Sequence, residues 1–185
     1  MPFLKFKLIA ITLLYSLTAP LSAAPLSPQQ LQELTEKARQ GDMGAQSDLA
    51  DRYHSGDGVT KDDSQAAFWY TKLADQGVAE AQLTLALMYI RGEGLDQDDA
   101  QALHWLTLAA EQRLALAQYL VGVAHAEGHG VERDPIKAYM WYEIAAAMDY
   151  QNAIDARDDL ASQLQQGQIQ AAEKMATDWW MKFHH

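Results

Sequence analysis

Residues 81–116 read AQLTLALMYIRGEGLDQDDAQALHWLTLAAEQRLAL, and the main features of this stretch recur in the same register on both sides of it. Matching positions lie 36 residues apart, as Ala81 and Ala117 do. The clearest sets are Ala45, Ala81, Ala117 and Ala153; Gly56, Gly92 and Gly128; Gly58, Gly94 and Gly130; Asp62, Asp98 and Asp134; and Trp69, Trp105 and Trp141. A fixed period of this length indicates an array of stacked structural repeats.

Each copy of the repeat predicts a first helix that ends at a pair of glycines. In the middle copy, Ala81, Leu85 and Tyr89 fall four residues apart and mark one helical face. Gly92 and Gly94 follow directly, and glycine is the residue that most readily takes the backbone conformation needed to end a helix. The first helix of the middle copy therefore ends near Gly92.

A second helix follows after a short turn. Asp98 stands where a side chain can cap the first amides of this helix, and Ala102 and Trp105 mark its buried face. The third copy supports the assignment, since Asp134 and Pro135 give a capping residue followed by a first-turn proline. Because Trp69, Trp105 and Trp141 recur with the period, we expect them to be core residues.

These residues give the chain a specific resemblance. The pattern of Ala81, Leu85, Tyr89, Gly92, Gly94, Asp98, Ala102, Trp105 and Ala110 resembles the Sel1-like repeat, a relative of the tetratricopeptide repeat. Three full copies are expected at 45–80, 81–116 and 117–152. The resemblance implies an all-α fold, a right-handed α-solenoid of helix pairs with capping helices at both ends.

The flanking segments read as caps. Residues 24–44 hold one helix, in which Ser27 and Gln30 are spaced for a capping box around Pro28 and Gly41 ends the helix. Because no repeat precedes it, we assign this helix as the N-terminal cap. Residues 153–185 resemble the closing segment of such arrays and predict two helices at about 152–165 and 168–183.

Three positions depart from the pattern. His125 stands where the other copies have Tyr53 and Tyr89, and we expect a looser third pair there. Arg113 and Asp149 replace the glycine of the first copy, Gly77. At these two positions we expect a different helix ending.

The first 23 residues have the form of a secretory signal peptide. Lys5 and Lys7 precede an apolar run over 8–17, and Ser22 and Ala23 give a small-residue end. We expect cleavage after Ala23 and a periplasmic or secreted protein; a retained interfacial anchor is the alternative. The apolar run is too short to span a bilayer.

Net charge and the absence of cysteine exclude several classes of partner and of covalent anchor. Loss of Lys5 and Lys7 would move the formal net charge from −11 to −13, which argues against nucleic acid and anionic membrane as partners. No cysteine is present, so the sequence predicts neither a lipoprotein anchor nor a disulfide. We expect a monomer with no cofactor.

Two local patterns suggest metal sites. His125 and His129 stand four apart around Glu127, which resembles a zinc protease helix, but the acid is misplaced and Gly128 interrupts the helix. We expect a core His125 and a turn His129, with a metal role as the alternative. The second pattern is a set of acids in the turns, which could bind calcium or cap the following helices, and we expect capping. These acids are Asp62, Asp63, Asp96, Asp98 and Asp99.

A candidate binding face lies on the first helices. Positions equivalent to 48, 51, 52 and 55 are three and four residues apart and form one face away from the repeat's core positions. The candidate protein-binding residues there are Leu87, Met88, Arg91, Leu120, Val123 and Glu127. The resemblance implies that first helices line the concave side. The alternative is that these apolar residues pack against the C-terminal cap or neighbouring helices.

The resemblance implies an exported, non-enzymatic adaptor that binds a protein or peptide in envelope assembly, signalling or host contact. One alternative is a protein that binds or hydrolyses cell-wall or β-lactam substrates. No serine or cysteine nucleophile stands in a recognisable elbow, and no glycine-rich phosphate loop is present. A purely structural envelope component is the other alternative.

Overall fold

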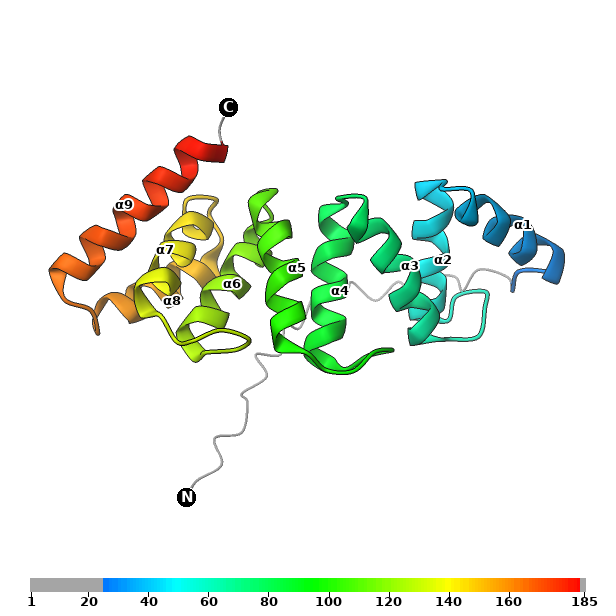
Figure 1. Ribbon diagram of the computed structural model, residues 1–185, viewed down its shortest axis with the longest axis horizontal. Coiled ribbons are helices and arrows are strands. Elements are labelled where there is room, and N and C mark those ends of the chain that lie inside the picture. The colour runs from blue at the N-terminus through cyan, green and yellow to red at the C-terminus, as the bar shows by residue number, and fades with distance from the viewer. Residues whose placement is uncertain (1–24, 184–185) are drawn as a thin grey trace, which may run out of the picture.

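The computed structural model describes residues 25–183, which form nine helices and no strand (Figure 1). The expected signal peptide and the final two histidines lie outside these residues. The helices are α1 Pro28–Arg39, α2 Met43–Ser55, α3 Asp63–Asp75, α4 Ala79–Arg91, α5 Asp99–Glu111, α6 Ala115–Glu127, α7 Pro135–Ala146, α8 Gln151–Ala161 and α9 Gln166–Phe183. The expected all-α solenoid is confirmed.

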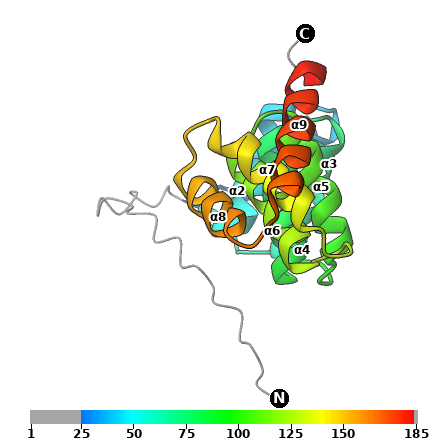
Figure 2. The same ribbon diagram turned by 90° about the vertical axis from the view of Figure 1, so that its left-hand side faces the viewer.

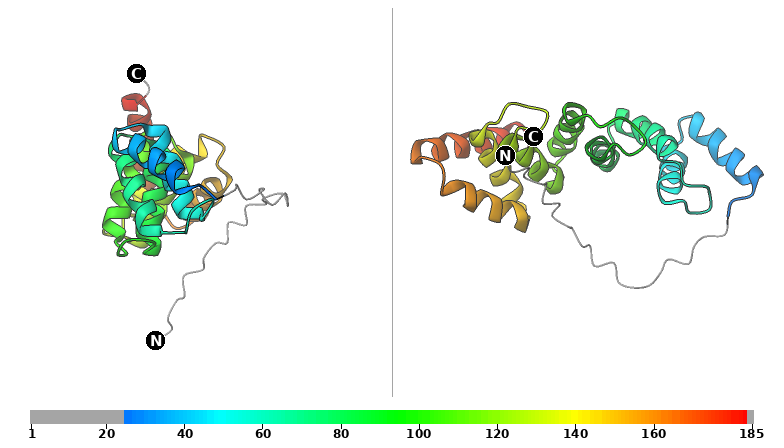
Figure 3. Two further views of the ribbon diagram at one scale, coloured as in Figure 1. Left: turned by 90° about the vertical axis from the view of Figure 1, so that its right-hand side faces the viewer. Right: turned by 90° about the horizontal axis from the view of Figure 1, so that it is seen from below.

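The helices form an elongated row rather than a layered globule. α2 pairs with α3, α4 with α5, and α6 with α7, and each pair packs against the next. The row runs from α1 at one end to α8 and α9 at the other (Figure 1). Seen from below, it is bowed, with α8 and the loop after α2 projecting to the same side (Figure 3, right).

The predicted caps begin the second helix of each pair. The Asp98 carboxylate accepts hydrogen bonds from the amides of Ala100 and Gln101, each at 2.9 Å. Asp62 and Asp134 cap α3 and α7 in the same way. Each cap satisfies amides that have no partner inside the helix, so the repeated aspartate fixes where each second helix starts.

The second glycine of each turn lets one repeat touch the previous one. Gly94 has a φ of +75°, and a Cβ built on it would lie 2.1 Å from the carbonyl oxygen of Asp63. Gly130 repeats this approach to Asp99, at 2.2 Å. In both cases the loop after a first helix lies directly against the start of the preceding second helix, so only glycine fits there.

The expected change of helix ending at Arg113 and Asp149 is wrong. Arg113 has a φ of 69° and Asp149 of 58°, close to the 84° of Gly77. The amides of all three donate to a carbonyl three residues earlier, at 2.9 to 3.0 Å. The turn geometry is therefore kept, although this conformation is costly for residues with a side chain.

A ladder of buried glutamines links neighbouring repeats. Gln82 donates to the carbonyl of Ala74 at 3.1 Å and accepts from the side chain of Gln112 at 2.8 Å. Gln46 makes the equivalent bonds in the first copy. In the third copy Met148 stands where Gln112 would, so the Oε1 of the fully buried Gln118 has no hydrogen-bond partner within the described chain.

Restoring the missing donor should stabilise the protein. A buried acceptor without a partner costs about 1–3 kcal/mol, so we expect Met148→Gln to raise the free energy of unfolding by about 1 kcal/mol. Gln112→Met, the reverse exchange in the intact copy, should lower it by a similar amount. Chemical denaturation measures both, and equal changes of the same sign would contradict the ladder.

α1 follows the repeat pattern, which its assignment as the N-terminal cap did not anticipate. Ala38 is buried like Ala74 and Ala110, its equivalents in α3 and α5. Its carbonyl accepts from Gln46 at 3.0 Å, as the carbonyl of Ala74 accepts from Gln82. α1 is thus the second helix of a partial copy, and it closes that end of the row (Figure 3, left). The predicted capping box is confirmed, with the Ser27 hydroxyl accepting from the Gln30 amide at 3.2 Å.

At the other end, α8 occupies the first-helix position of a further copy, but no second helix of the described chain pairs with it. Arg157 of α8 stands at a position where the other copies bury an apolar residue, namely Leu49, Leu85 and Val121. Asp158 is exposed at the next position, where the other copies bury alanine or glycine. These polar residues give α8 a side that water can solvate, so the array can end there.

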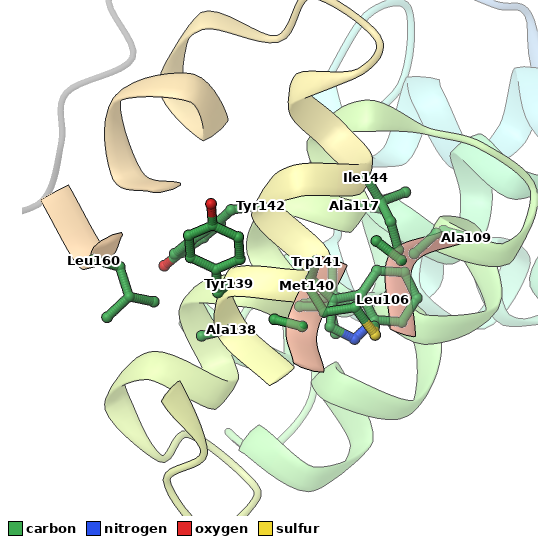
Figure 4. Packing of buried hydrophobic residues seen from close by; sticks show 14 of the residues in the cluster. Leu106, Ala109, Ala117, Ala138, Tyr139, Met140, Trp141, Tyr142, Ile144 and Leu160 are labelled. Atoms are coloured by element: carbon green, nitrogen blue, oxygen red, sulfur yellow. The ribbon is translucent and has the colours of Figure 1, made fainter. Parts of the chain in front are cut away.

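α9 closes the array by a route the repeat does not predict. It packs against α7 instead of pairing with α8, and α7 lies between the two (Figure 2). Trp179 of α9 makes an edge-to-face contact with Trp141, with ring centroids 5.8 Å apart. α9 thereby helps cover the largest core cluster, which surrounds Met140, Trp141 and Leu106 (Figure 4). Trp105 contacts both this cluster and the one around Trp69.

The expected loosening of the third pair at His125 is wrong. His125 is only 9% exposed, and its neighbour on α6, Gly122, lets α7 come unusually close. A Cβ on Gly122 would lie 2.5 Å from the ring of Tyr142. The Nδ1 atom of His125 is buried and has no hydrogen-bond partner within residues 25–183.

His125 should make the third repeat sensitive to acid. Burial lowers the pKa of His125 from 6.5, Lys137 lowers it further, and Asp134 opposes them. The fold therefore favours the neutral ring, so stability is full above pH 6.5 and is lost as the pH falls toward the lower folded pKa. Tyrosine occupies this position in the other copies. When the pH is lowered from about 7.5 to about 5.5, the melting temperature of His125→Tyr should fall less than that of the wild type. His104→Tyr, at an exposed histidine, is the control. Equal falls in the melting temperature of the wild type and of His125→Tyr would contradict the assignment.

Candidate binding face on the first helices

Three rows of equivalent positions run across α2, α4, α6 and α8, the last position of the third row falling just after α8, and we call them together the first-helix face. None of their residues is fully buried. In chain order the rows are Asp48, Thr84, Leu120 and Ala156; Asp51, Leu87, Val123 and Asp159; and Ser55, Arg91, Glu127 and Gln163. The second row has an acid at each end and two apolar residues between them, whereas the first row begins with an acid and has Thr84 and Leu120 in its middle.

The centre of the face is formed by Leu87, Leu120 and Val123. All three are half-buried, so each keeps apolar surface in contact with solvent. Leu120 and Val123 also rest against the largest core cluster, whereas Leu87 belongs to none of the core clusters. These three predicted residues occupy neighbouring rows of the repeat and are each partly accessible, and Arg91 and Glu127 in the third row are exposed.

Met88 does not belong to this surface, which corrects its assignment as an adaptable binding residue. Its side chain is 1% exposed and packs in the core with Ala81 and Leu85. Met88 follows Leu85 by three residues and Ala81 by seven, so all three fall on the buried side of α4. Met88 also follows Thr84 by four residues and is equivalent to position 52, and this spacing predicted a place on the surface instead. Ala124, its equivalent in α6, is buried for the same reason.

The ends of the face are acidic. Asp51 accepts a hydrogen bond at 2.7 Å from the hydroxyl of Tyr70, which fixes its carboxylate at the edge of α2. Asp159 is exposed on α8. Neither carboxylate has an ion-pair partner among residues 25–183. Sequence reasoning did not single out Asp159, because α8 was assigned only as a cap.

Arginines near the face do not offset these acids, because each already has its own carboxylate partner. The pairs are Arg52 with Asp48 at 2.6 Å, Arg91 with Glu93 at 3.6 Å, and Arg157 with Glu143 at 3.0 Å and Asp158 at 2.8 Å. The first-helix face therefore keeps an excess of negative charge at both ends.

Tyrosines add polar groups near the third copy. The rings of Tyr119 and Tyr142 have centroids 5.7 Å apart, and Tyr150 lies 5.5 Å from Tyr119. Burial raises the pKa of Tyr142, with Tyr119 and Glu127 raising it further. Burial also raises the pKa of Tyr119, and Tyr150 and Glu127 act in the same direction. Both phenols stay protonated at neutral pH and can donate hydrogen bonds beside Glu127.

His125 and His129 do not come together as metal ligands. His125 is buried in α6, whereas the ring of His129 lies in the following turn, 2.8 Å from Glu127 and 3.8 Å from Asp99. Within the described residues no group of three or more histidine, aspartate or glutamate side chains could hold a metal ion. Of the turn aspartates, Asp62 and Asp98 act as helix caps. None of the helices described here has the length and apolar character needed to cross a membrane.

Stacked helix pairs, nested glycine loops and polar end helices define the protein as an α-solenoid repeat protein. The chain belongs to the Sel1 repeat family, whose model matches residues 44–78, 79–114 and 115–150, more than half of the chain. These copies begin one or two residues earlier than those counted from Ala45, Ala81 and Ala117. No curated protein matches the sequence.

Two solved structures resemble the chain. One is a protective antigen of uropathogenic Escherichia coli strains that displays an SLR fold, with 30% identity and a TM-score of 0.72 over 85% of this chain. The present chain spans about a third, 34%, of that protein's length. The other is a Sel1 repeat protein from Oxalobacter formigenes, with 35% identity and a TM-score of 0.62. That match covers 71% of this chain and 98% of the other.

Proposed function

We propose that this protein is an exported, non-enzymatic adaptor that binds a segment of another protein on its first-helix face. The observation that carries the proposal is the apolar centre formed by Leu87, Leu120 and Val123, whose side chains are only half-buried. An apolar patch rimmed by polar residues marks an interaction site more often than chance exposure does. Sel1 repeats generally mediate protein–protein interaction, which supports this class of function.

Export rests on the character of residues 1–23, with their basic start, short apolar run and small-residue end. A role in envelope assembly, signalling or host contact follows from that location. A protective antigen among the structural relatives is compatible with a surface or envelope setting. The polar sides of α1 and α8 support a monomer, because they leave no apolar end for a second copy to extend the array.

Chemical crosslinking in the native cells, followed by mass spectrometry, tests the proposal. We expect one stoichiometric partner for the wild type and for Phe68→Asp, a matched change at an exposed aromatic residue on α3. Leu87→Asp should lose the partner while its melting temperature stays within a few degrees of wild type. A partner retained by a folded Leu87→Asp variant would contradict the proposed face.

The rival function is an enzyme acting on cell-wall or β-lactam substrates. Such an enzyme needs a pocket with several polar side chains of perturbed pKa. The pockets around α1 are shallow and lined mainly by residues such as Gln32, Glu33 and Lys37. Incubation with peptidoglycan fragments and a β-lactam panel decides: turnover that disappears on one polar substitution would replace the adaptor with the enzyme.

A further inference from the structure

We propose that the partner segment is an extended peptide with basic residues at both ends and an apolar centre, lying across the first-helix face from α2 to α8. This inference rests on the proposed function and names the chemistry of its partner. It follows from the order of residues in the second row, which is Asp51, Leu87, Val123 and Asp159. An acid stands at each end, and two apolar residues stand between them.

The two end carboxylates are available to a cation from outside the chain. Asp51 is exposed and positioned by the Tyr70 hydroxyl, and Asp159 is exposed near the end of α8. Neither is engaged by a lysine or arginine of residues 25–183, whereas Arg52, Arg91 and Arg157 are each held by another carboxylate. A peptide lysine or arginine at each end would complete these two unpaired charges.

The charge of the whole protein favours the same partner. The described residues carry all 25 acidic side chains but lack Lys5 and Lys7, so their formal charge is −13 rather than −11. A field of one sign attracts oppositely charged segments and speeds their association. An acidic segment would meet repulsion at both ends of the face.

The apolar residues in the middle of the first-helix face favour a peptide whose central residues are apolar. Leu87 and Val123 stand between the acids, and Leu120 lies beside them in the neighbouring row. Apolar peptide side chains placed there would remove the remaining exposed surface of these residues from water. Nearby, the Glu127 carboxylate can accept a hydrogen bond from a peptide amide, and the Tyr119 hydroxyl can donate one to a peptide carbonyl.

An extended segment crosses the successive first helices with the fewest residues. An extended chain rises about 3.3 Å per residue, whereas a helix rises only about 1.5 Å per residue. An extended segment therefore reaches from α2 to α8 with about half the residues that a helix would need.

Selection from a library of random displayed peptides tests the proposal on residues 24–185, the chain expected after signal cleavage. We expect enriched peptides with lysine or arginine at both ends of an apolar stretch. Synthetic copies should bind about tenfold more weakly to Asp51→Asn with Asp159→Asn, and binding to wild type should weaken as salt rises. The matched control carries Asp75→Asn with Asp96→Asn, two exposed acids outside the first-helix face, and should bind like wild type.

Three results would overturn the inference: no enrichment, enrichment without basic ends, or basic peptides that bind the Asp51→Asn and Asp159→Asn variant as well as the wild type. These results are separable from failure of the adaptor role. A cellular partner lost in Leu87→Asp but retained in the double asparagine variant would leave the first-helix face in place and remove only the basic segment. A partner retained by the folded Leu87→Asp variant would remove the face itself.

Discussion

Gly94→Ala is expected to destabilise the protein by about 3 kcal/mol. An added Cβ would lie 2.1 Å from the carbonyl oxygen and 2.3 Å from the carbonyl carbon of Asp63, and these are backbone atoms that cannot turn aside. The φ of +75° adds a conformational cost of about 1–2 kcal/mol. Shifting a packed backbone contact contributes about the same again or more. Denaturant unfolding measures the total.

Gly77→Ala separates the two causes of this loss. Gly77 has a φ of +84°, but a Cβ there would meet nothing within 4 Å. This variant should therefore lose only the conformational part, about 1 kcal/mol. Arg113 and Asp149 already tolerate the same conformation in the other copies. Equal losses for Gly94→Ala and Gly77→Ala would contradict the nested contact between repeats.

Deleting residues 166–185 should cause the protein to associate or aggregate. α9 covers Met140 and Trp141, which are each 7% exposed, and supplies Ala172 and Ala176 to the same core. Without α9 these aromatic and apolar side chains would form an exposed patch on α7. Light scattering after size-exclusion chromatography measures the association, and the melting temperature should fall sharply.

A milder variant keeps this test informative if the truncated chain does not fold. Trp179→Ala removes the contact with Trp141 and should cost about 3 kcal/mol. Met181→Ala, on an exposed position of the same helix, is the matched control and should change little. A truncated protein that stays monomeric with an unchanged melting temperature would show that α9 is not a cap.

The repeat period alone predicted most of the fold. A 36-residue period in Gly92, Asp98 and their equivalents places a helix end and a helix start in every copy, because each residue has a local physical role. The same local logic also identified the capping box of α1. Features that depend on one residue and its immediate neighbours were therefore readable from the sequence.

Features that depend on tertiary packing were not readable in the same way. Arg113 and Asp149 keep a glycine-like conformation because the chain on both sides is held by the repeat, which no local rule anticipates. Likewise, nothing in residues 166–183 specifies that α9 packs on α7 instead of α8. Met88 was misplaced because two helical faces share the three- and four-residue spacing, and only the packed structure tells which is buried.

The most direct test of the binding face is site-specific photo-crosslinking in the native cells. A photoreactive amino acid placed at Leu87 or at Val123 should crosslink one and the same partner, because the two positions are neighbours in the row between Asp51 and Asp159. The same residue at Phe68 on α3 should give no such product, although Phe68 is 49% exposed. Crosslinks from Phe68 to that partner, or none from either Leu87 or Val123, would contradict the account.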